Sequence, residues 1–452
     1  MTSKYQLRES ILALLERIEG SNGYSHILID KEIRKKQFTP KDQALLTEVV
    51  YGTVQRKLTL DHYLDDYIDH RKKISPWVRM LLRMSVYQMC FLDRVPSHAI
   101  IHEAVEIAKK RGHKGIGSFV NGVLRNLQRN GVPDIKNLQP LERRISIETS
   151  TPEWLVTRWL SMYGEKTTID MCTENLTHKQ MSVRIQSIKI SREEAMEQLM
   201  QEGIKTEASR ISDDGIIVLE GNVLNTALFQ NGFLTVQDQG SMLVGSIMKV
   251  ENGMHVLDCC SAPGGKTTHI AEKMNGTGTV FAYDIQKNKI HRLKKRAEQL
   301  ELGNIHAEEG DARQLQKKHP HKSFERVLVD APCSGLGVIR TKPDIKYQKE
   351  EADIQRLATI QKDILHHVAP LIKQDGYLIY STCTVDKEEN ENVVQTFLHE
   401  HPEFMVDETF FSELPSALDG CQGITEWGVQ IFPQTIGSDG FFLTRLKKAT
   451  NI

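Results

Sequence analysis

Short apolar runs alternate with longer amphipathic segments between residues 254 and 448, and this alternation constrains the fold more than any other feature of the chain. The runs that have the length and content of buried strands are residues 254–258, 279–284, 304–311, 325–330 and 376–381. Helical segments, for example residues 285–302 and 354–372, separate them. Strands and helices that alternate in this way predict an α/β fold with a doubly wound, mostly parallel sheet. A last run, 439–448, has no crossover helix after it, and we expect it to close one edge of the sheet.

The chain before this region has a different pattern, which predicts two further domains. At 452 residues the chain is too long for a single core. Residues 1–135 contain consecutive amphipathic segments with apolar residues three and four positions apart, which predicts an all-helical domain. The clearest of these helical segments are residues 8–18, 41–68, 76–92 and 97–110. Residues 136–235 mix helices with strand-like runs at 181–186 and 215–221, which predicts a small α+β module that links the domains or guides RNA. The doubly wound domain then takes residues 236–452.

Composition excludes a membrane-spanning or disulfide-built protein. Hydrophobic residues make up 39% of the chain, charged residues 26%, and the mean hydropathy is −0.38. No apolar stretch approaches the length of a bilayer span, and the start lacks the regions of a secretory signal, so we expect a cytoplasmic location. The seven cysteines are odd in number, scattered and free of any Cys-x-x-Cys spacing, so neither a metal site nor a disulfide framework is expected. We expect Cys90, Cys172, Cys259 and Cys421 to serve packing or to have no specific role.

Charge is distributed unevenly along the chain. Residues 1–150 hold 25 Lys and Arg against 17 Asp and Glu, a net charge of +8, whereas the remainder holds 33 against 42, a net charge of −9. A basic first part on an acidic body favours a polyanionic partner such as RNA. A solvated basic surface without a partner explains the charge alone equally well.

A Gly-rich turn follows the first predicted strand, in "DCCSAPGGKTTHIAEKM" (258–274). A strand that runs through such a turn into a helix is where α/β sheets bind nucleotides, because the helix N-terminus offers unpaired N–H groups. The spacing matches neither the dinucleotide pattern nor the P-loop, since no glycine stands at the first position of the P-loop pattern. Acids at the next two strand ends instead favour an adenosyl ligand: Asp284 can accept both hydroxyls of a ribose, and Asp311 the amino group of an adenine.

Five segments, taken in order, resemble a known family. They are "LDRVPSHAIIHEAVEIAKKRGHKGIGSFVNGVLRNL" (92–127), the Gly-rich "DCCSAPGGKTTHIA" (258–271), "DAPCSGLGVIRTKPDIKY" (330–347), "YSTCTVDKEENENVV" (380–394) and "FPQTIGSDGFF" (432–442). The first is similar to the NusB-type RNA-binding domain, and the others are similar to the motifs of RNA cytosine-5 methyltransferases. The chain as a whole resembles the bacterial 16S ribosomal RNA enzymes of the Sun/Fmu (RsmB) type. It departs from the pattern at Ser261, usually alanine, and at "VRIQ" (183–186), often Arg-Val-Asn in the middle module.

This resemblance implies a fold, a cofactor and a reaction. The fold is a Rossmann-like class I methyltransferase domain that binds S-adenosylmethionine, and the reaction is methylation of carbon 5 of a cytosine in 16S rRNA, the one conventionally numbered 967. The loop residues implied to hold the methionine end are Cys260, Ser261, Ala262, Pro263, Gly264 and Gly265. Lys266 is implied to pair with the cofactor carboxylate.

Two cysteines carry the chemistry that the resemblance implies. Carbon 5 of cytosine is a poor nucleophile, so a thiolate must first add at carbon 6. Spacing alone does not decide which cysteine attacks, because in DNA cytosine-5 enzymes the Pro-Cys residue does so. In the RNA family the Thr-Cys residue attacks, which implies Cys383 as nucleophile and Cys333 as the residue that assists release of the adduct. Asp330 is implied to hydrogen-bond the flipped cytosine and to touch the cofactor.

RNA is the expected partner, and the target base must lie in a loop or be extruded from a helix. The residues expected to contact RNA are Lys109, Lys110, Arg111, Lys114, Arg125, Arg340 and Lys342. A monomer without metal or membrane partners is expected. Two alternatives stay open: an RNA-binding or antitermination factor with an inactive methyltransferase half, and the same chemistry on transfer RNA or another RNA.

Overall fold

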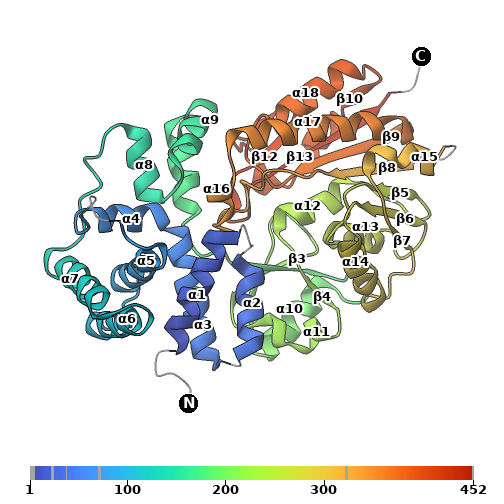
Figure 1. The fold of residues 1–452 in the computed structure, drawn as a ribbon. Helices are drawn as coiled ribbons and strands as arrows, with labels where there is room; N and C mark the ends of the chain where they lie inside the picture. The colour runs from blue at the N-terminus through green and yellow to red at the C-terminus, as the bar shows by residue number, and fades with distance from the viewer. Residues whose placement is uncertain (1–5, 22–24, 37, 70–72, 321–323, 450–452) are drawn as a thin grey trace. The chain divides into compact units, whose positions relative to one another are not determined.

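A computed structural model describes residues 6–21, 25–36, 38–69, 73–320 and 324–449, and the chain divides into two compact units (Figure 1). The first unit contains Met1–Thr177 together with Ile339–Gln348. The second unit contains His178–Val338 and Lys349–Ile452. The chain therefore leaves the second unit for ten residues and returns to it.

The first unit is helical, as predicted for residues 1–135. Its helices are α1 (Gln6–Ser21), α2 (Ser25–Lys36), α3 (Pro40–Gln55), α4 (Lys57–Asp65), α5 (Pro76–Phe91), α6 (Ser97–Arg111), α7 (Lys114–Asn130), α8 (Leu141–Thr149) and α9 (Glu153–Glu174). The apolar faces of α1 to α7 form one core that includes the fully buried Leu46, Leu81 and Leu124. The helix predicted over 41–68 is divided between α3 and α4, which meet at Arg56.

Helices α8 and α9 are grouped with this helical unit, although the sequence pattern assigned their residues to the small module. Hydrogen bonds attach the end of α8 to α4: Thr59 Oγ1 donates to Ile147 O at 2.6 Å, and Leu58 N donates to Ser150 Oγ at 2.8 Å. The sequence pattern changes at residue 136, but these contacts tie α8 to the helices before it. The boundary of the helical unit therefore lies further along the chain, at Thr177.

Residues 339–348, which include helix α16 (Ile345–Gln348), pack within the first unit. Ser25 Oγ donates to Asp344 Oδ1 at 2.5 Å, and the hydroxyl of Tyr347 lies 2.9 Å from Ser150 Oγ. Lys346 is buried and donates to Gln55 O at 2.8 Å, and burial lowers its pKa to about 7. These contacts make the segment part of the helical unit's interior.

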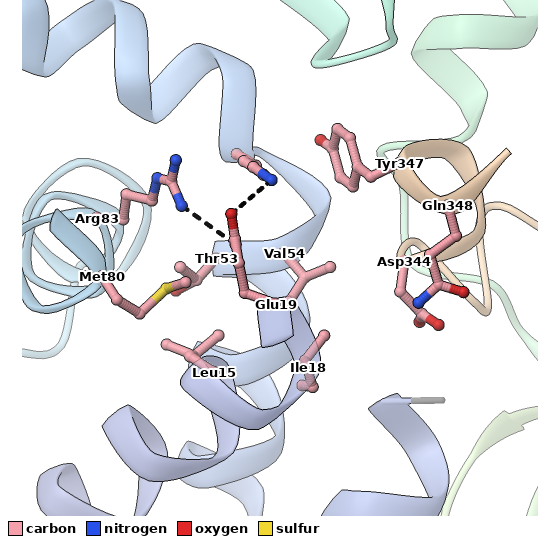
Figure 2. A pocket seen from close by; sticks show the side chains of 11 residues that line it. Leu15, Ile18, Glu19, Thr53, Val54, Met80, Arg83, Asp344, Tyr347 and Gln348 are labelled. Carbon is pink, nitrogen blue, oxygen red and sulfur yellow. Dashed lines mark hydrogen bonds and ion pairs between the residues drawn. The ribbon is translucent and has the colours of Figure 1, made fainter. Parts of the chain in front are cut away.

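A cavity of about 100 Å³ lies in the first unit beside this segment (Figure 2). Glu19 lines it and pairs with Lys57 at 2.8 Å and with Arg83 at 3.2 Å. Asp344 and Tyr347 line the same space. None of the residues predicted to bind the cofactor or to react lines this cavity.

The second unit begins with a small antiparallel sheet in the order β2-β3-β1-β4. Its strands are β1 (Met181–Ile185), β2 (Lys205–Ala208), β3 (Gly215–Glu220) and β4 (Leu234–Val236), and they pack against α10 (Arg192–Gln201). The short helix α11 (Ala227–Gln230) precedes β4. The predicted strands at 181–186 and 215–221 correspond to β1 and β3. Ser191 caps α10 and Glu194 completes a capping box, which explains why the helix begins there.

Nine strands of the described residues form the large sheet, in the order β11-β12-β13-β9-β8-β5-β6-β7 with β10 paired to β13. The parallel strands are β5 (His255–Asp258), β6 (Thr279–Asp284), β7 (Ile305–Glu309), β8 (Phe324–Asp330) and β9 (Ile372–Thr382). The remaining strands are β10 (Phe404–Val406), β11 (Ile424–Thr425), β12 (Gly428–Ile431) and β13 (Phe441–Lys448). The predicted parallel core is confirmed strand by strand.

Strand β13 is not an edge, contrary to the prediction. It pairs antiparallel with β9 on one side and with β12 and β10 on the other. The strands β11 and β12 are too short to be detected as apolar runs. The sequence pattern therefore missed the hairpin that forms the edge of the sheet beyond β13.

Helices cover both faces of this sheet (Figure 1). On one face α17 (Glu351–Val368) and α18 (Glu391–Glu400) pack on side chains such as Leu257 and Tyr380. On the other face α12 (Gln239–Ile247) and α13 (Gly265–Lys273) pack on Val256 and Ile379. Adjacent strand residues thus point to opposite cores, which is the doubly wound arrangement. The remaining helices are α14 (Lys287–Gln299), α15 (Leu315–Lys318), α19 (Thr409–Ser412) and α20 (Pro433–Ile436).

Candidate active site

Two cysteines meet at the carboxyl ends of β8 and β9. These neighbouring parallel strands align Asp330 with Ser381, so the loops that follow them emerge side by side. Cys333 lies in the first loop and Cys383 in the second, and their Sγ atoms are 3.4 Å apart. Both cysteines are partly exposed, whereas Cys259 and Cys172 are buried. A small planar ligand at this edge of the sheet can therefore contact both sulfur atoms.

The surroundings favour the protonated thiol at Cys333. The pKa of this thiol is raised well above its usual value, first by the hydrogen bond with Cys383 and then by burial and by the negative charges of Cys383 and Glu389. A thiol of this kind is a poor nucleophile at neutral pH, but it can donate a hydrogen bond to the second sulfur.

Lys266 lies beside these sulfur atoms and pairs with Asp330. Its Nζ atom is 2.8 Å from Asp330 Oδ2, and Ser381 Oγ donates to Asp330 Oδ1 at 2.9 Å. Burial alone would lower the pKa of Lys266, but the negative charges at Asp330, Cys383 and Asp258 outweigh it and raise that pKa. Lys266 therefore carries a permanent positive charge. In this structure the partner of Lys266 is Asp330, whereas the family resemblance implied the carboxylate of the cofactor.

The Gly-rich turn connects β5 to α13. Ser261 N donates to Tyr283 O at 2.8 Å, which holds the turn against β6. Gly264 precedes α13 with φ of 110°, a left-handed conformation that favours glycine, and a Cβ atom there would lie 2.5 Å from Leu293. These constraints explain why the turn needs small residues at this place.

Asp258 ends β5 directly below this turn and is fully buried. Thr267 Oγ1 donates to its Oδ2 atom at 2.7 Å, while its Oδ1 atom has no hydrogen-bond partner. Burial raises the pKa of Asp258 from 3.8 to about 7. The carboxyl group thus changes protonation state near neutral pH.

We expect Asp258→Asn to change the pH dependence of stability. Because the folded-state pKa lies above the unfolded value, folding takes up a proton at Asp258, so its contribution is greatest below pH 3.8 and is lost as pH rises to about 7. Asparagine lacks this titration. Between about pH 4.5 and 7.5 the free energy of unfolding of the variant should rise relative to the wild type by at most about 3 kcal/mol.

Urea unfolding at a series of pH values measures this difference. Asp284→Asn, at the end of the adjacent strand and only partly buried, is the matched control. If the two variants show the same pH dependence, the account of Asp258 is wrong.

Asp284 and Asp311 follow β6 and β7, as the sequence predicted. Asp284 Oδ1 accepts a hydrogen bond from Gln286 N at 2.8 Å. Asp311 accepts from Arg313 Nη2 at 2.7 Å, and this hydrogen bond is the main reason why the pKa of Asp311 is lowered. Both carboxylates lie at the same edge of the sheet as the turn, because parallel strands end on one side.

The residues of this edge fit an adenosyl ligand. Ser261 Oγ and Asp258 Oδ1 are buried without a hydrogen-bond partner, and both belong to the strand end and turn that would face the ligand. Buried polar atoms are normally paired, so two orphaned atoms in one turn favour a bound polar group. The carboxylates of Asp284 and Asp311 supply the acceptors that a ribose and an adenine require.

Sequence reasoning missed two residues that position the site. Arg184 on β1 is fully buried, and its guanidinium donates to Gly265 O at 2.7 Å and to Glu272 Oε1 at 2.9 Å. It therefore supports α13 from the small module, and its "VRIQ" segment is not an RNA surface at this position. Glu389 is also fully buried and lies against the Cys333 loop. Glu389 belongs to the acidic run 386–391, and charged residues in such a run give no sequence signal that they are buried.

The residues predicted to contact RNA lie in the first unit. Lys109, Lys110 and Arg111 are exposed and pair with Glu106, Glu9 and Glu16. Lys114 and Arg125 are exposed on α7, and Lys342 is partly exposed. Arg340 is nearly buried and pairs with Glu174 at 2.9 Å, so a phosphate could reach it only after this ion pair opens.

Family models match three consecutive parts of the chain. The model of 16S rRNA methyltransferase RsmB/F matches residues 246–447, the NusB family model matches residues 5–129, and the RsmF/B-like ferredoxin-like domain model matches residues 151–224. The last match extends across α9, which the structure groups with the helical unit.

Curated relatives match the chain along its whole length. A Bacillus subtilis protein named "Probable ribosomal RNA small subunit methyltransferase B" is 43% identical over 98% of this chain and 99% of its own length. A Synechocystis protein of the same name is 33% identical over the same shares of both chains. Among solved structures, PH0851 is 25% identical with a TM-score of 0.80 and covers 98% of both chains. A methyltransferase homologue from Pyrococcus horikoshii has a TM-score of 0.59 and shares the fold over 69% of this chain.

The doubly wound sheet and the turn after its first strand define a Rossmann-like methyltransferase domain, joined to a helical NusB-like domain. The full-length matches go one step further. The chain belongs to the RsmB/F family of 16S rRNA methyltransferases, and the protein is therefore a methyltransferase. Within the described ranges we find no helix that combines the length and the apolar content of a membrane span.

Proposed function

We propose that this protein transfers a methyl group from S-adenosylmethionine to carbon 5 of a cytosine in 16S rRNA, through a covalent bond between Cys383 and carbon 6. The observation that carries this proposal is the 3.4 Å separation of the Cys333 and Cys383 sulfur atoms at the ends of β8 and β9. One thiol is sufficient for attack on the ring. A second thiol in contact with the first can assist when that bond is broken again.

Cys383 acts as the nucleophile. Addition of its thiolate to carbon 6 moves the electrons of the C5–C6 double bond onto carbon 5. The positive charge of Lys266, whose Nζ pairs with Asp330 at 2.8 Å, favours a negative sulfur at this place. Asp330 offers a carboxylate to the amino group of the cytosine, which distinguishes cytosine from uracil.

The cofactor supplies an electrophilic methyl group that carbon 5 can attack. The backbone N–H groups of residues 260–265 would hold its methionine end at the start of α13. Asp284 and Asp311 would accept hydrogen bonds from the ribose hydroxyls and the adenine amino group. These contacts orient the methyl group toward the base held beside Cys383.

Cys333 assists release of the product. After methylation a base removes the hydrogen of carbon 5, its electron pair restores the C5–C6 double bond, and Cys383 leaves as a thiolate. The protonated Cys333 can donate its hydrogen to that departing sulfur. The same thiol cannot compete with Cys383 for carbon 6 while it stays protonated.

The helical unit would hold the RNA. The exposed cations on α6 and α7, at Lys109, Lys110, Arg111, Lys114 and Arg125, can bind phosphates, with Lys342 as a further contact. The target is cytosine 967, presented in a loop of naked or early-assembly rRNA, because a base within A-form helix is out of reach.

Methylation of defined RNAs tests the proposal. The full chain is incubated with labelled S-adenosylmethionine and either 16S rRNA or transfer RNA, and bisulfite sequencing then maps the modified base. We expect label in 16S rRNA at cytosine 967 only. Label in transfer RNA alone would show that the protein performs the same reaction on transfer RNA. Binding of RNA without any label would indicate an RNA-binding factor with an inactive methyltransferase half.

A further inference from the structure

A buried carboxylate and the amide that it binds together fix both ends of the Pro332-Cys333-Ser334 turn. Glu389 lies between β9 and α18 and is fully buried. Its Oε1 atom accepts from Ser334 N at 2.8 Å and its Oε2 atom accepts from Ser334 Oγ. Gln361 Nε2 donates both to Glu389 Oε1 at 3.0 Å and to Pro332 O at 2.9 Å. Cys333 is therefore held between two residues that the same pair of side chains anchors.

The same carboxylate is connected to the loop of Cys383. Ser334 Oγ lies 2.8 Å from Thr384 Oγ1, and since the single hydroxyl hydrogen of Ser334 points to Glu389, Thr384 must donate in this hydrogen bond. Thr384 follows Cys383 directly. Tyr380, on the strand that leads to Cys383, donates through its hydroxyl to Glu389 O at 2.6 Å. A continuous chain of hydrogen bonds thus links the two sulfur-bearing loops.

Glu389 affects Cys333 through its charge as well as through its hydrogen bonds. Burial raises the pKa of Glu389, and the hydrogen bonds from Ser334 and Gln361 offset only part of this rise. Three donors directed at one carboxyl group suit its ionised form. The pKa of the Cys333 thiol is raised first by its hydrogen bond with Cys383 and by burial, and a negative charge of Glu389 behind the loop adds to this rise, so Cys333 keeps its hydrogen.

We propose that Glu389 is the positioning residue of the two-cysteine centre: it sets the contact between the sulfur atoms and keeps Cys333 in the form that donates to Cys383. This inference rests on the proposed function, because it assigns to Glu389 the control of adduct release. The residue is fully buried and touches neither the base nor the cofactor, so its effect passes through Cys333.

Glu389→Gln tests this in the full-length protein with 16S rRNA and S-adenosylmethionine. Glutamine keeps the size of the side chain but removes the charge and one acceptor. We expect adduct release to slow by about 10- to 100-fold, so that a protein–RNA adduct accumulates on denaturing gels, while the KM for S-adenosylmethionine stays unchanged. The pH above which release fails should also move to lower values, because Cys333 loses its hydrogen more easily.

A double variant separates positioning from simple stabilisation. In the Cys333→Ala background, Glu389→Gln should slow release no further, because the group through which it acts is gone.

Glu391→Gln is the matched control: Glu391 is also buried, and it lies two residues further along the same segment. We expect this control to release product like the wild type. If Glu389→Gln variants refold poorly, Ser334→Ala breaks the same chain of hydrogen bonds and should also accumulate adduct.

Two results would overturn the inference: wild-type release by Glu389→Gln or by Ser334→Ala, or full additivity with Cys333→Ala. Failure of the proposed function has a different signature. In that case the wild-type protein itself neither methylates 16S rRNA nor forms an adduct.

Discussion

Cys383→Ala should lower methylation of 16S rRNA by at least about 1,000-fold, because carbon 5 of the cytosine is not activated unless a thiolate adds to carbon 6. The loss should appear in the turnover number. Binding of S-adenosylmethionine, measured by calorimetry, should stay within about twofold of the wild type, since the residues proposed to hold the cofactor lie on β5, β6 and β7 and the loops after them. No protein–RNA adduct should form at any pH.

Cys421→Ala is the matched control for this experiment. Cys421 is partly exposed like Cys383, but it lies beside β11, outside the two-cysteine centre. Its substitution should leave methylation unchanged. Substantial activity in Cys383→Ala, together with none in Cys333→Ala, would assign the attack to the other sulfur.

Cys333→Ala should trap the covalent intermediate. The nucleophile is intact, so the bond to carbon 6 forms, but the departing sulfur has lost the hydrogen donor that lay 3.4 Å away. We expect multiple turnover to fall by about 100-fold or more, while an RNA-linked protein band survives denaturing electrophoresis.

The double variant Cys333→Ala/Cys383→Ala identifies the sulfur in that band. It should show no adduct, because Cys383 supplies the bond. An adduct in the double variant, or wild-type turnover by Cys333→Ala, would contradict the roles assigned to the two residues.

The parallel core of the sheet was predictable because its strands are buried on both faces. Such strands appear in the sequence as uninterrupted apolar runs, and β5, β6 and β8 coincide with the predicted runs to within one residue. The convergence of Cys333 and Cys383 followed from the same rule, since the ends of parallel strands meet at one edge.

Elements without such a pattern escaped prediction. The strands β11 and β12 have two and four residues, too few to show a period, and this is why β13 was placed at the edge. Glu389 and Arg184 are charged residues in segments that read as solvent-facing, and only their partners reveal that both are buried. The partners of these buried charges lie far away in the sequence and cannot be read from a local pattern. Arg184, for example, binds Glu272, which lies 88 residues further along the chain.

The excursion of residues 339–348 has a consequence for synthesis on the ribosome. The helical unit is completed by Lys346 and Tyr347, which are translated about 170 residues after α9 has emerged. Until then, Gln55 O lacks its hydrogen bond from Lys346, and Ser150 Oγ has Leu58 N as a partner but lacks Tyr347. We therefore expect the nascent amino-terminal helices to persist as an unfinished, less stable intermediate while β5 to β8, the first four strands of the Rossmann-like sheet, are being made, and a fragment that stops after α9 should inherit the same defect.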